Sequence, residues 1–303
     1  IDLVPVREPN MTPYEILLSE SQERMLVCVK TGHLKKVQQI LAKWELEADE
    51  IGKVTDDGLF RVTEDDKEVA EIPCLALTEG CPTYEREGKE STEVKNLRTK
   101  DLSNVRTKSS SYEKIFLELL GSPNISSKQW LYRQYDTTVR TNTVLTPGAD
   151  AGVVRLRENN KAIAATTDCN GRYVYLNPRM GAKAAVAEAA RNLVSVGALP
   201  MAVTNNLNFG NPLKPEIYYQ FREAVLGMSE ACKLFETPVT GGNVSFYNET
   251  SSTPIYPTPV IGMVGVIEDT ENLTRPIFRE SGDTILLLGD NTEELGGSEY
   301  LYV

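Results

Sequence analysis

Residues 204–247 read TNNLNFGNPLKPEIYYQFREAVLGMSEACKLFETPVTGGNVSFY, and they decide the fold expected for this chain. An apolar stretch predicts a strand over residues 200–206 that runs into an amide-rich loop. Apolar residues then recur at helical spacing over Pro215–Leu234 and predict an amphipathic helix. A second strand is expected over residues 239–246, so the pattern indicates a sheet with a helix packed on it.

The residues at the end of this stretch have the chemistry of a ligand site. Gly241 and Gly242 would let the backbone approach a ligand and leave N–H groups for anionic oxygens. Asn243 offers an amide oxygen to a hard cation, and Ser245 offers a hydroxyl. The alternative is an ordinary turn, because a Gly-Gly-Asn run is also a common turn former.

The composition is that of a soluble globular protein, with 303 residues, 41% of them hydrophobic, and a formal net charge of −11. This charge argues against nucleic acid binding, which needs a basic surface. No apolar run approaches the roughly 18 residues of a membrane helix. The first residues also lack the basic head and apolar core of a signal peptide. We therefore expect a cytoplasmic protein without a nucleic acid or membrane partner.

The five cysteines indicate a reduced environment, because their number is odd and none forms a Cys-x-x-Cys pair. Cys28 and Cys232 lie in apolar patterns and are expected to be buried thiols. The only histidine, His33, is expected on the surface, and no ligand pair has zinc spacing. The chain starts without methionine and ends soon after a strand expected over residues 284–288. We therefore expect a fragment of a longer protein.

The remaining periodicity predicts α+β organisation along the whole chain. The expected strands cover residues 25–29, 59–63, 68–72, 153–157, 162–167 and 260–267, and the expected helices cover residues 34–41, 115–120, a segment after Ser126, and 181–196. Residues 79–111 are polar and charged, which is typical of a linker or mobile loop.

Six segments together resemble the phosphoribosylformylglycinamidine synthase family in its short bacterial form. They are residues 18–25 (LSESQERM), 135–144 (YDTTVRTNTV), 185–198, 205–212 (NNLNFGNP), 241–245 (GGNVS) and 256–265 (YPTPVIGMVG). The resemblance covers nearly the whole chain. It implies a fold of the aminoimidazole ribonucleotide synthetase-like superfamily, which is α+β with antiparallel sheets and helices packed on one face.

The resemblance also implies a domain organisation, because this family joins two similar halves in one polypeptide. Residues 1–80 would be part of the C-terminal-type companion domain of the first half, and residues 81–112 a linker or mobile loop. Residues 113–270 would be the N-terminal-type nucleotide-binding domain of the second half. Residues 271–303 would begin the second companion domain.

The implied activity is that of an ATP-dependent carbon–nitrogen ligase of purine biosynthesis, which converts formylglycinamide ribonucleotide to its amidine with ATP and Mg²⁺. The implied partners are a glutaminase subunit and a small bridging subunit. The implied contacts are Glu20, Ser21, Gln22 and Ser245 to the substrate, Asn205 and Gly242 to ATP, and Asn243 to magnesium. Asn205 stands where the family is expected to have an aspartate, so it keeps the hydrogen-bonding shape and loses the charge.

Three alternatives remain open. Residues 20–22 could be only a helix terminus followed by a strand. The family's catalytic histidines belong to the first half, so this chain could be a non-catalytic nucleotide-binding scaffold half and is expected to be inactive alone. A related enzyme, such as aminoimidazole ribonucleotide synthetase or selenophosphate synthetase, would have the same fold.

Overall fold

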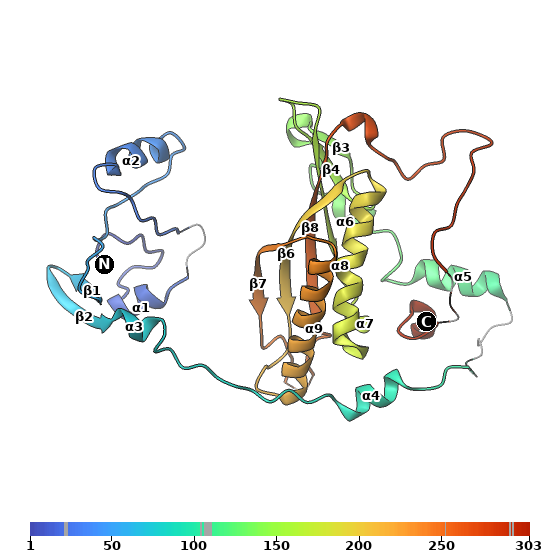
Figure 1. Ribbon diagram of the computed structural model, residues 1–303, viewed down its shortest axis with the longest axis horizontal. Coiled ribbons are helices and arrows are strands. Elements are labelled where there is room, and N and C mark those ends of the chain that lie inside the picture. Colours follow the sequence, from blue (N-terminus) through green and yellow to red (C-terminus); the bar gives the residue numbers. More distant parts are fainter. Residues whose placement is uncertain (21–23, 104, 106–110, 252, 291, 293) are drawn as a thin grey trace. The chain divides into compact units, whose positions relative to one another are not determined.

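The computed structural model describes residues 1–20, 24–103, 105, 111–251, 253–290, 292 and 294–303. The chain divides into two compact units, Ile1–Glu85 and Arg86–Val303 (Figure 1). Each unit has its own secondary structure and is described by itself.

The first unit contains the helix predicted over residues 34–41 and the strands predicted over residues 59–63 and 68–72. Its elements are α1 (Pro13–Leu18), α2 (Leu34–Ala42), β1 (Leu59–Glu64), β2 (Lys67–Pro73) and α3 (Cys74–Leu77), with β1 and β2 antiparallel. A capping box starts α1: the Thr12 hydroxyl accepts from the Glu15 backbone N–H, and the Glu15 carboxylate accepts from the Thr12 backbone N–H.

Two expectations for this unit are wrong. Residues 25–29 form no strand, and Met25 is 82% exposed. Cys28, expected in the core, is exposed as well. Apolar residues alone do not make a strand, because a strand obtains its backbone hydrogen bonds from a neighbour, and no described strand pairs with this segment.

The second unit is built on a six-stranded sheet with the order β3-β4-β5-β8-β6-β7. The strands are β3 (Thr143–Leu145), β4 (Gly152–Arg155), β5 (Ala162–Asp168), β6 (Leu199–Asn208), β7 (Val239–Ser245) and β8 (Thr258–Ile267). Every pair is antiparallel except β6–β7, which is parallel. The α+β class is therefore confirmed, with one parallel pair at an edge. A parallel pair needs a long crossover connection, which α9 (Pro215–Leu234) provides.

Helices cover one face of this sheet. Figure 1 shows α8 (Pro178–Ser195) and α9 side by side against the strands, with α7 (Gly171–Leu176) next to them. Burial alternates along β8, so Ile261, Met263 and Ile267 are buried under the helices. Alanines along α8 allow its backbone to lie close to the sheet. The opposite face, called the open face below, exposes apolar side chains such as Val154 and Ile163.

The segment predicted as a linker contains a helix. α4 (Thr92–Arg98) starts at a Ser91 cap and buries Val94, which is 5% exposed. The Lys89 backbone N–H donates to the carbonyl oxygen of Pro215 at 3.1 Å. This part of the segment therefore packs on the second unit, while the domain limits as a whole stay a prediction.

The remaining helices are short, and one expected strand is absent. The helices are α5 (Tyr112–Gly121), α6 (Gln129–Tyr132) and α10 (Glu299–Tyr302), with single 3₁₀ turns at Val139–Thr141 and Thr270–Asn272. Residues 284–288 form no strand, and Leu288 is 91% exposed. None of the described helices is both long and apolar enough to cross a membrane.

The contact between α8 and α9 depends on Gly227. A Cβ atom at this position would lie 2.9 Å from the carbonyl carbon of Arg179, which is backbone and cannot rotate away. At Gly121, the last residue of α5, a Cβ atom would meet nothing within 4 Å.

Gly227→Ala should therefore lower the free energy of unfolding by about 1–3 kcal/mol, because the steric overlap exceeds the gain in helix propensity. Gly121→Ala is the matched control, and it should raise stability by a few tenths to about 1 kcal/mol. Urea unfolding of both variants measures the two changes. Equal stabilisation by both substitutions would contradict this account of the helix contact.

Candidate functional site

Strand register places the predicted contacts Asn205 and Gly242 in one row across the sheet with residues that are distant in the sequence. Asp168 on β5 pairs with Ile261 on β8, Ile261 pairs with Asn205 on β6, and Asn205 pairs with Gly242 on β7. This row faces the helices. The Asn192 amide of α8 donates to Asp168 at 2.7 Å, and the Asn205 amide donates to the Met228 sulfur of α9 at 3.4 Å.

Asn205 and Gly242, the predicted ATP contacts, interlock. A Cβ atom at Gly242 would overlap Asn205 Oδ1 and lie 2.7 Å from the Asn205 carbonyl oxygen. Asn205 therefore occupies the space that the missing side chain leaves, and its amide nitrogen is directed to Met228. The structure brings these two residues together on the helix side of the sheet. Their contact with ATP stays a prediction.

Asn243 and Ser245 lie on the open face, because successive side chains of a strand alternate between faces. Asn243 pairs with Asn206, and Ser245 pairs with Asn208, which in turn pairs with Thr258. These five side chains form the polar patch of the site: amides and hydroxyls without a formal charge. The four predicted contacts of this unit are thus divided between the two faces of the sheet.

Three members of the polar patch were missed by sequence reasoning: Asn206, Asn208 and Thr258. Asn208 has structural hydrogen bonds, because its amide donates to the carbonyl oxygens of Asn206 at 3.0 Å and Thr258 at 3.3 Å. The signal that could have found the two asparagines is the alternation along β6. Val203 and Leu207 are buried on one face of this strand, so the polar residues at the alternate positions lie on the other face.

A pair of charged side chains closes the loop that follows β6. Glu249 accepts from the Lys214 ammonium at 3.0 Å and from the Asn211 backbone N–H at 3.1 Å. The hydrogen bond from Lys214 is the main reason that the pKa of Glu249 is lowered, and the bond from Asn211 adds to it. The loop after β6 is therefore fastened to the connection after β7.

Asp168 at the end of β5 is a half-buried carboxylate. It accepts from the Thr166 hydroxyl at 2.9 Å and from Asn192. Burial raises its pKa, although both hydrogen bonds act in the opposite direction. Burial, with the nearby charges of Glu188 and Asp168, raises the pKa of the Cys169 thiol to about 12. Cys169 is therefore protonated at neutral pH and unsuited to nucleophilic attack.

The predicted substrate segment belongs to the first unit. Glu20 is exposed and follows the end of α1 by two residues, whereas Ser21 and Gln22 lie outside the described residues. The neighbouring Ser19 accepts from the Arg24 guanidinium through its carbonyl oxygen at 2.7 Å and its hydroxyl at 2.9 Å. The roles of these three residues stay predictions.

The segment of residues 135–144 lies at the opposite end of the sheet from the polar patch. Arg140 and Thr141 have left-handed backbones, with φ of 61° and 56°. Arg157 holds this turn by donating to Asn142 Oδ1 at 2.6 Å and to the Arg140 carbonyl oxygen at 2.8 Å. The structure thus gives this segment a role in anchoring β3.

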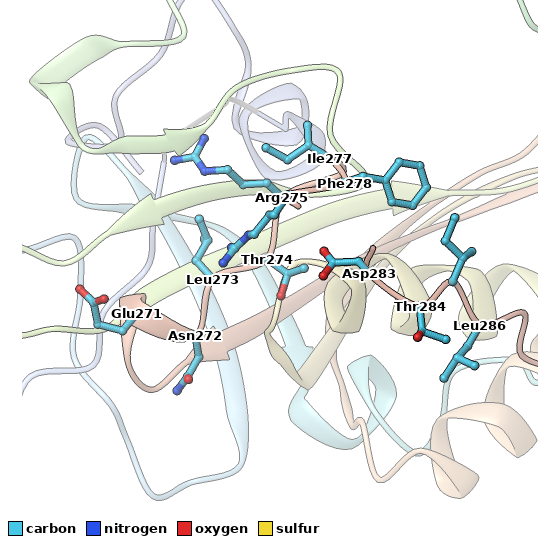
Figure 2. Close-up of a pocket in the computed structure, with 12 residues that line it drawn as sticks. Glu271, Asn272, Leu273, Thr274, Arg275, Ile277, Phe278, Asp283, Thr284 and Leu286 are labelled. Carbon is cyan, nitrogen blue, oxygen red and sulfur yellow. The ribbon is translucent and has the colours of Figure 1, made fainter. Parts of the chain in front are cut away.

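A hollow of about 600 Å³ lies away from the polar patch. Figure 2 shows that its walls come from the single segment 271–286 that follows β8. Ile277, Phe278 and Leu286 line it and are largely exposed. It contains none of the predicted site residues.

Asn243 fits a role as one magnesium ligand. It is exposed, and its amide makes no hydrogen bond to another described residue, so its oxygen is available. No group of three or more His, Cys, Asp and Glu side chains with the geometry of a metal site occurs among the described residues. Mg²⁺ commonly takes few protein ligands together with phosphate oxygens and water, so Asn243 could complete such a shell but not provide it.

The domains define the class of protein. Residues 148–267 match the family described as "AIR synthase related protein, N-terminal domain", and residues 1–65 match "AIR synthase related protein, C-terminal domain". These two matches fall in different units of the structure.

Whole-chain comparisons define the family within this class. The chain is 54% identical over 301 residues to phosphoribosylformylglycinamidine synthase subunit PurL of Moorella thermoacetica, and 53% identical over 303 residues to the PurL subunit of Caldanaerobacter subterraneus. It belongs to the PurL family. It spans 41% of the length of both relatives.

Solved structures agree with this assignment. "T. maritima PurL complexed with ATP" matches with a TM-score of 0.65 and 28% identity, over 90% of this chain and 42% of that chain. "Structure of PurLQS from Thermotoga maritima" matches with a TM-score of 0.67 and 28% identity, over the same shares of the two chains.

The interlock between Asn205 and Gly242 predicts that an alanine substitution lowers stability more at Gly242 than at the neighbouring Gly241. Gly242→Ala should displace Asn205 and lower the free energy of unfolding by about 1–3 kcal/mol. Gly241→Ala is the control, because a Cβ atom there would meet nothing within 4 Å; it should change stability by less than about 0.5 kcal/mol. Thermal and urea unfolding test this. Equal effects at both positions would contradict the interlock.

Asp168 should make stability depend on pH. Its folded-state pKa is raised above the ordinary value of 3.8, so its contribution to stability is complete below pH 3.8 and is lost as pH rises through the folded pKa. The stability of Asp168→Asn relative to wild type should therefore be higher at pH 7 than at pH 3. Asp136→Asn is the control of opposite sign, because hydrogen bonds from Thr138 lower the Asp136 pKa. Urea unfolding across this range measures both, and a pH-independent difference for Asp168→Asn would exclude the effect.

Proposed function

We propose that the protein to which this chain belongs is an ATP-dependent ligase that converts formylglycinamide ribonucleotide to formylglycinamidine ribonucleotide in purine biosynthesis. In this reaction ATP phosphorylates the amide oxygen, and ammonia then displaces the phosphate to give the amidine. The observation that carries the proposal is the identity of 53–54% to PurL subunits along the whole chain. A solved relative in "T. maritima PurL complexed with FGAR" supports the substrate, and another in complex with ATP supports the nucleotide.

We propose that two parts of this unit meet the ligands: the polar patch on the open face and the pair Asn205 and Gly242 on the helix side. Ser245 of the patch would contact the substrate, and Gly242 would contact ATP through its backbone. Asn205 would act near ATP by fixing Gly242, which agrees with the direction of its amide. Neutral amides and hydroxyls can hydrogen-bond to a charged ligand, and a cation that binds with the ligand would balance the charge of the ligand.

Asn243 would supply one oxygen to Mg²⁺ held by the phosphates of the nucleotide. The bound cation would neutralise phosphate charge. Glu20, Ser21 and Gln22 would contribute further substrate contacts in the complete protein. General acid–base chemistry would come from another part of that protein, because His33 is the only histidine of this sequence and is exposed.

The partners proposed are a glutaminase subunit, which would supply the ammonia, and a small bridging subunit. The match to "Structure of PurLQS from Thermotoga maritima" supports an assembly of this kind. We place the protein in the cytoplasm. The five cysteines support this, because all of them are free thiols.

A synthetase assay of the full-length protein tests the proposal. Ammonium chloride, ATP, Mg²⁺ and formylglycinamide ribonucleotide should yield ADP, phosphate and the amidine product without the glutaminase subunit. This chain alone is the control and should give no turnover. Nucleotide binding by the full-length protein without turnover would favour the alternative of a non-catalytic scaffold.

Asn243→Ala in the full-length protein should lower kcat/KM with magnesium-ATP and leave the melting temperature unchanged. Loss of one preorganised oxygen ligand corresponds to about 2–4 kcal/mol of transition-state stabilisation. Excess magnesium should restore part of the activity. Asn96→Ala is a matched control, because Asn96 in α4 is also exposed. Equal activity of the Asn243 variant and wild type at limiting magnesium would exclude Asn243 as a ligand.

A further inference from the structure

The side chain of Asn248 links the ends of β6 and β7. Its amide nitrogen lies 2.9 Å from the Ser245 carbonyl oxygen, 3.0 Å from the Ser245 hydroxyl and 3.2 Å from the Phe209 carbonyl oxygen. The backbone of the connection is shaped for this contact. Tyr247 is left-handed, with φ of 61°, and its N–H donates to the Gly210 carbonyl oxygen at 3.1 Å.

The surroundings decide the orientation of the Asn248 amide. Carbonyl oxygens only accept hydrogen bonds, so the atom between two of them must be the amide nitrogen. This nitrogen has two hydrogens for three acceptors. The Phe209 carbonyl already accepts from the Asn248 backbone N–H at 3.1 Å. The two hydrogens therefore go to the two nearer acceptors, the Ser245 carbonyl and the Ser245 hydroxyl.

This arrangement sets the direction of the Ser245 hydroxyl. The Ser245 hydroxyl has two alternative bonds to this amide: it can donate to Asn248 Oδ1 at 3.3 Å or accept from Nδ2 at 3.0 Å. The two amide atoms lie in nearly the same direction from the hydroxyl oxygen, so one bond excludes the other. With the shorter bond formed, the hydroxyl accepts from Asn248 and its hydrogen points away from the amide, toward another partner. Register with Asn208 places Ser245 on the open face, and the side chain is half-buried.

We propose that Asn248 is a positioning residue that makes Ser245 a hydrogen-bond donor toward an oxygen acceptor of the bound nucleotide substrate. This rests on the proposed function, in which Ser245 contacts that substrate. The acceptor is a carbonyl, ribose or phosphate oxygen of the substrate. Asn248 acts through Ser245 and does not itself touch the ligand.

A double-mutant cycle in the full-length protein tests this role. Asn248→Ala should raise KM for formylglycinamide ribonucleotide roughly tenfold, the equivalent of one lost hydrogen bond, with kcat and KM for ATP changed less than twofold. In the Ser245→Ala background the same substitution should change the substrate KM less than twofold. A role confined to folding would instead give equal effects in both backgrounds, and that result would overturn the proposal.

Controls separate this inference from loss of structure and from the proposed function. Thr250→Ala, in the same connection, should leave all constants unchanged, because among the described residues the Thr250 hydroxyl bonds to Thr253 and not to Ser245 or Asn248. If Asn248→Ala melts early, Asn248→Asp and calorimetric binding of the substrate at low temperature replace it. The carboxylate would accept the Ser245 hydroxyl hydrogen, so weaker binding of the substrate is expected, and unchanged binding would overturn the proposal.

Two outcomes separate this inference from the proposed function. If wild type turns over and Asn248→Ala has an unaltered substrate KM, the inference alone is refuted. If wild type shows neither turnover nor substrate binding, the proposed function is refuted together with the inference.

Discussion

The antiparallel pairing of β6 with β8 is the interaction on which the rest of the second unit depends. The two strands are separated in sequence by α9 and β7, yet they lie next to each other inside the sheet. β8 holds β5 on its other side, and β6 holds β7. A slip of one residue would exchange the two faces of β6. The helix-facing position of Asn205 and the open-face position of the polar patch therefore follow from this single register.

The sequence alone was sufficient to predict elements that depend on local interactions or that have a strong periodic pattern of apolar residues. α9 has the predicted limits, because Pro215 suits the first helical position and the apolar spacing buries Ile217 and Met228. The apolar runs at residues 25–29 and 284–288 are equally strand-like in sequence and form no strand. Strands require a partner, and a sequence pattern does not say whether a partner is available.

The site was predictable in composition but not in arrangement. The pattern of glycine, amide and hydroxyl at Gly242, Asn243 and Ser245 predicts a ligand site, and the contacts of these residues with ligands stay predictions. Their division between two faces depends on register with β6, which no local motif contains. The role proposed for Asn248 could not be predicted for the same reason. It depends on hydrogen bonds from one side-chain amide to the ends of two strands, β6 and β7. The resemblance supplied roles for single residues, and the structure supplies the contacts that hold them in place.

The thiols are distributed unevenly between the two units, and this has a practical consequence. Cys28, Cys74 and Cys81 are exposed and all belong to the first unit. Burial raises the pKa of both cysteines of the second unit, Cys169 and Cys232. Alkylating reagents attack the thiolate, so at neutral pH they discriminate between the units without any engineered substitution. A maleimide fluorophore would therefore mark the first unit of the native chain and leave the second unit unlabelled.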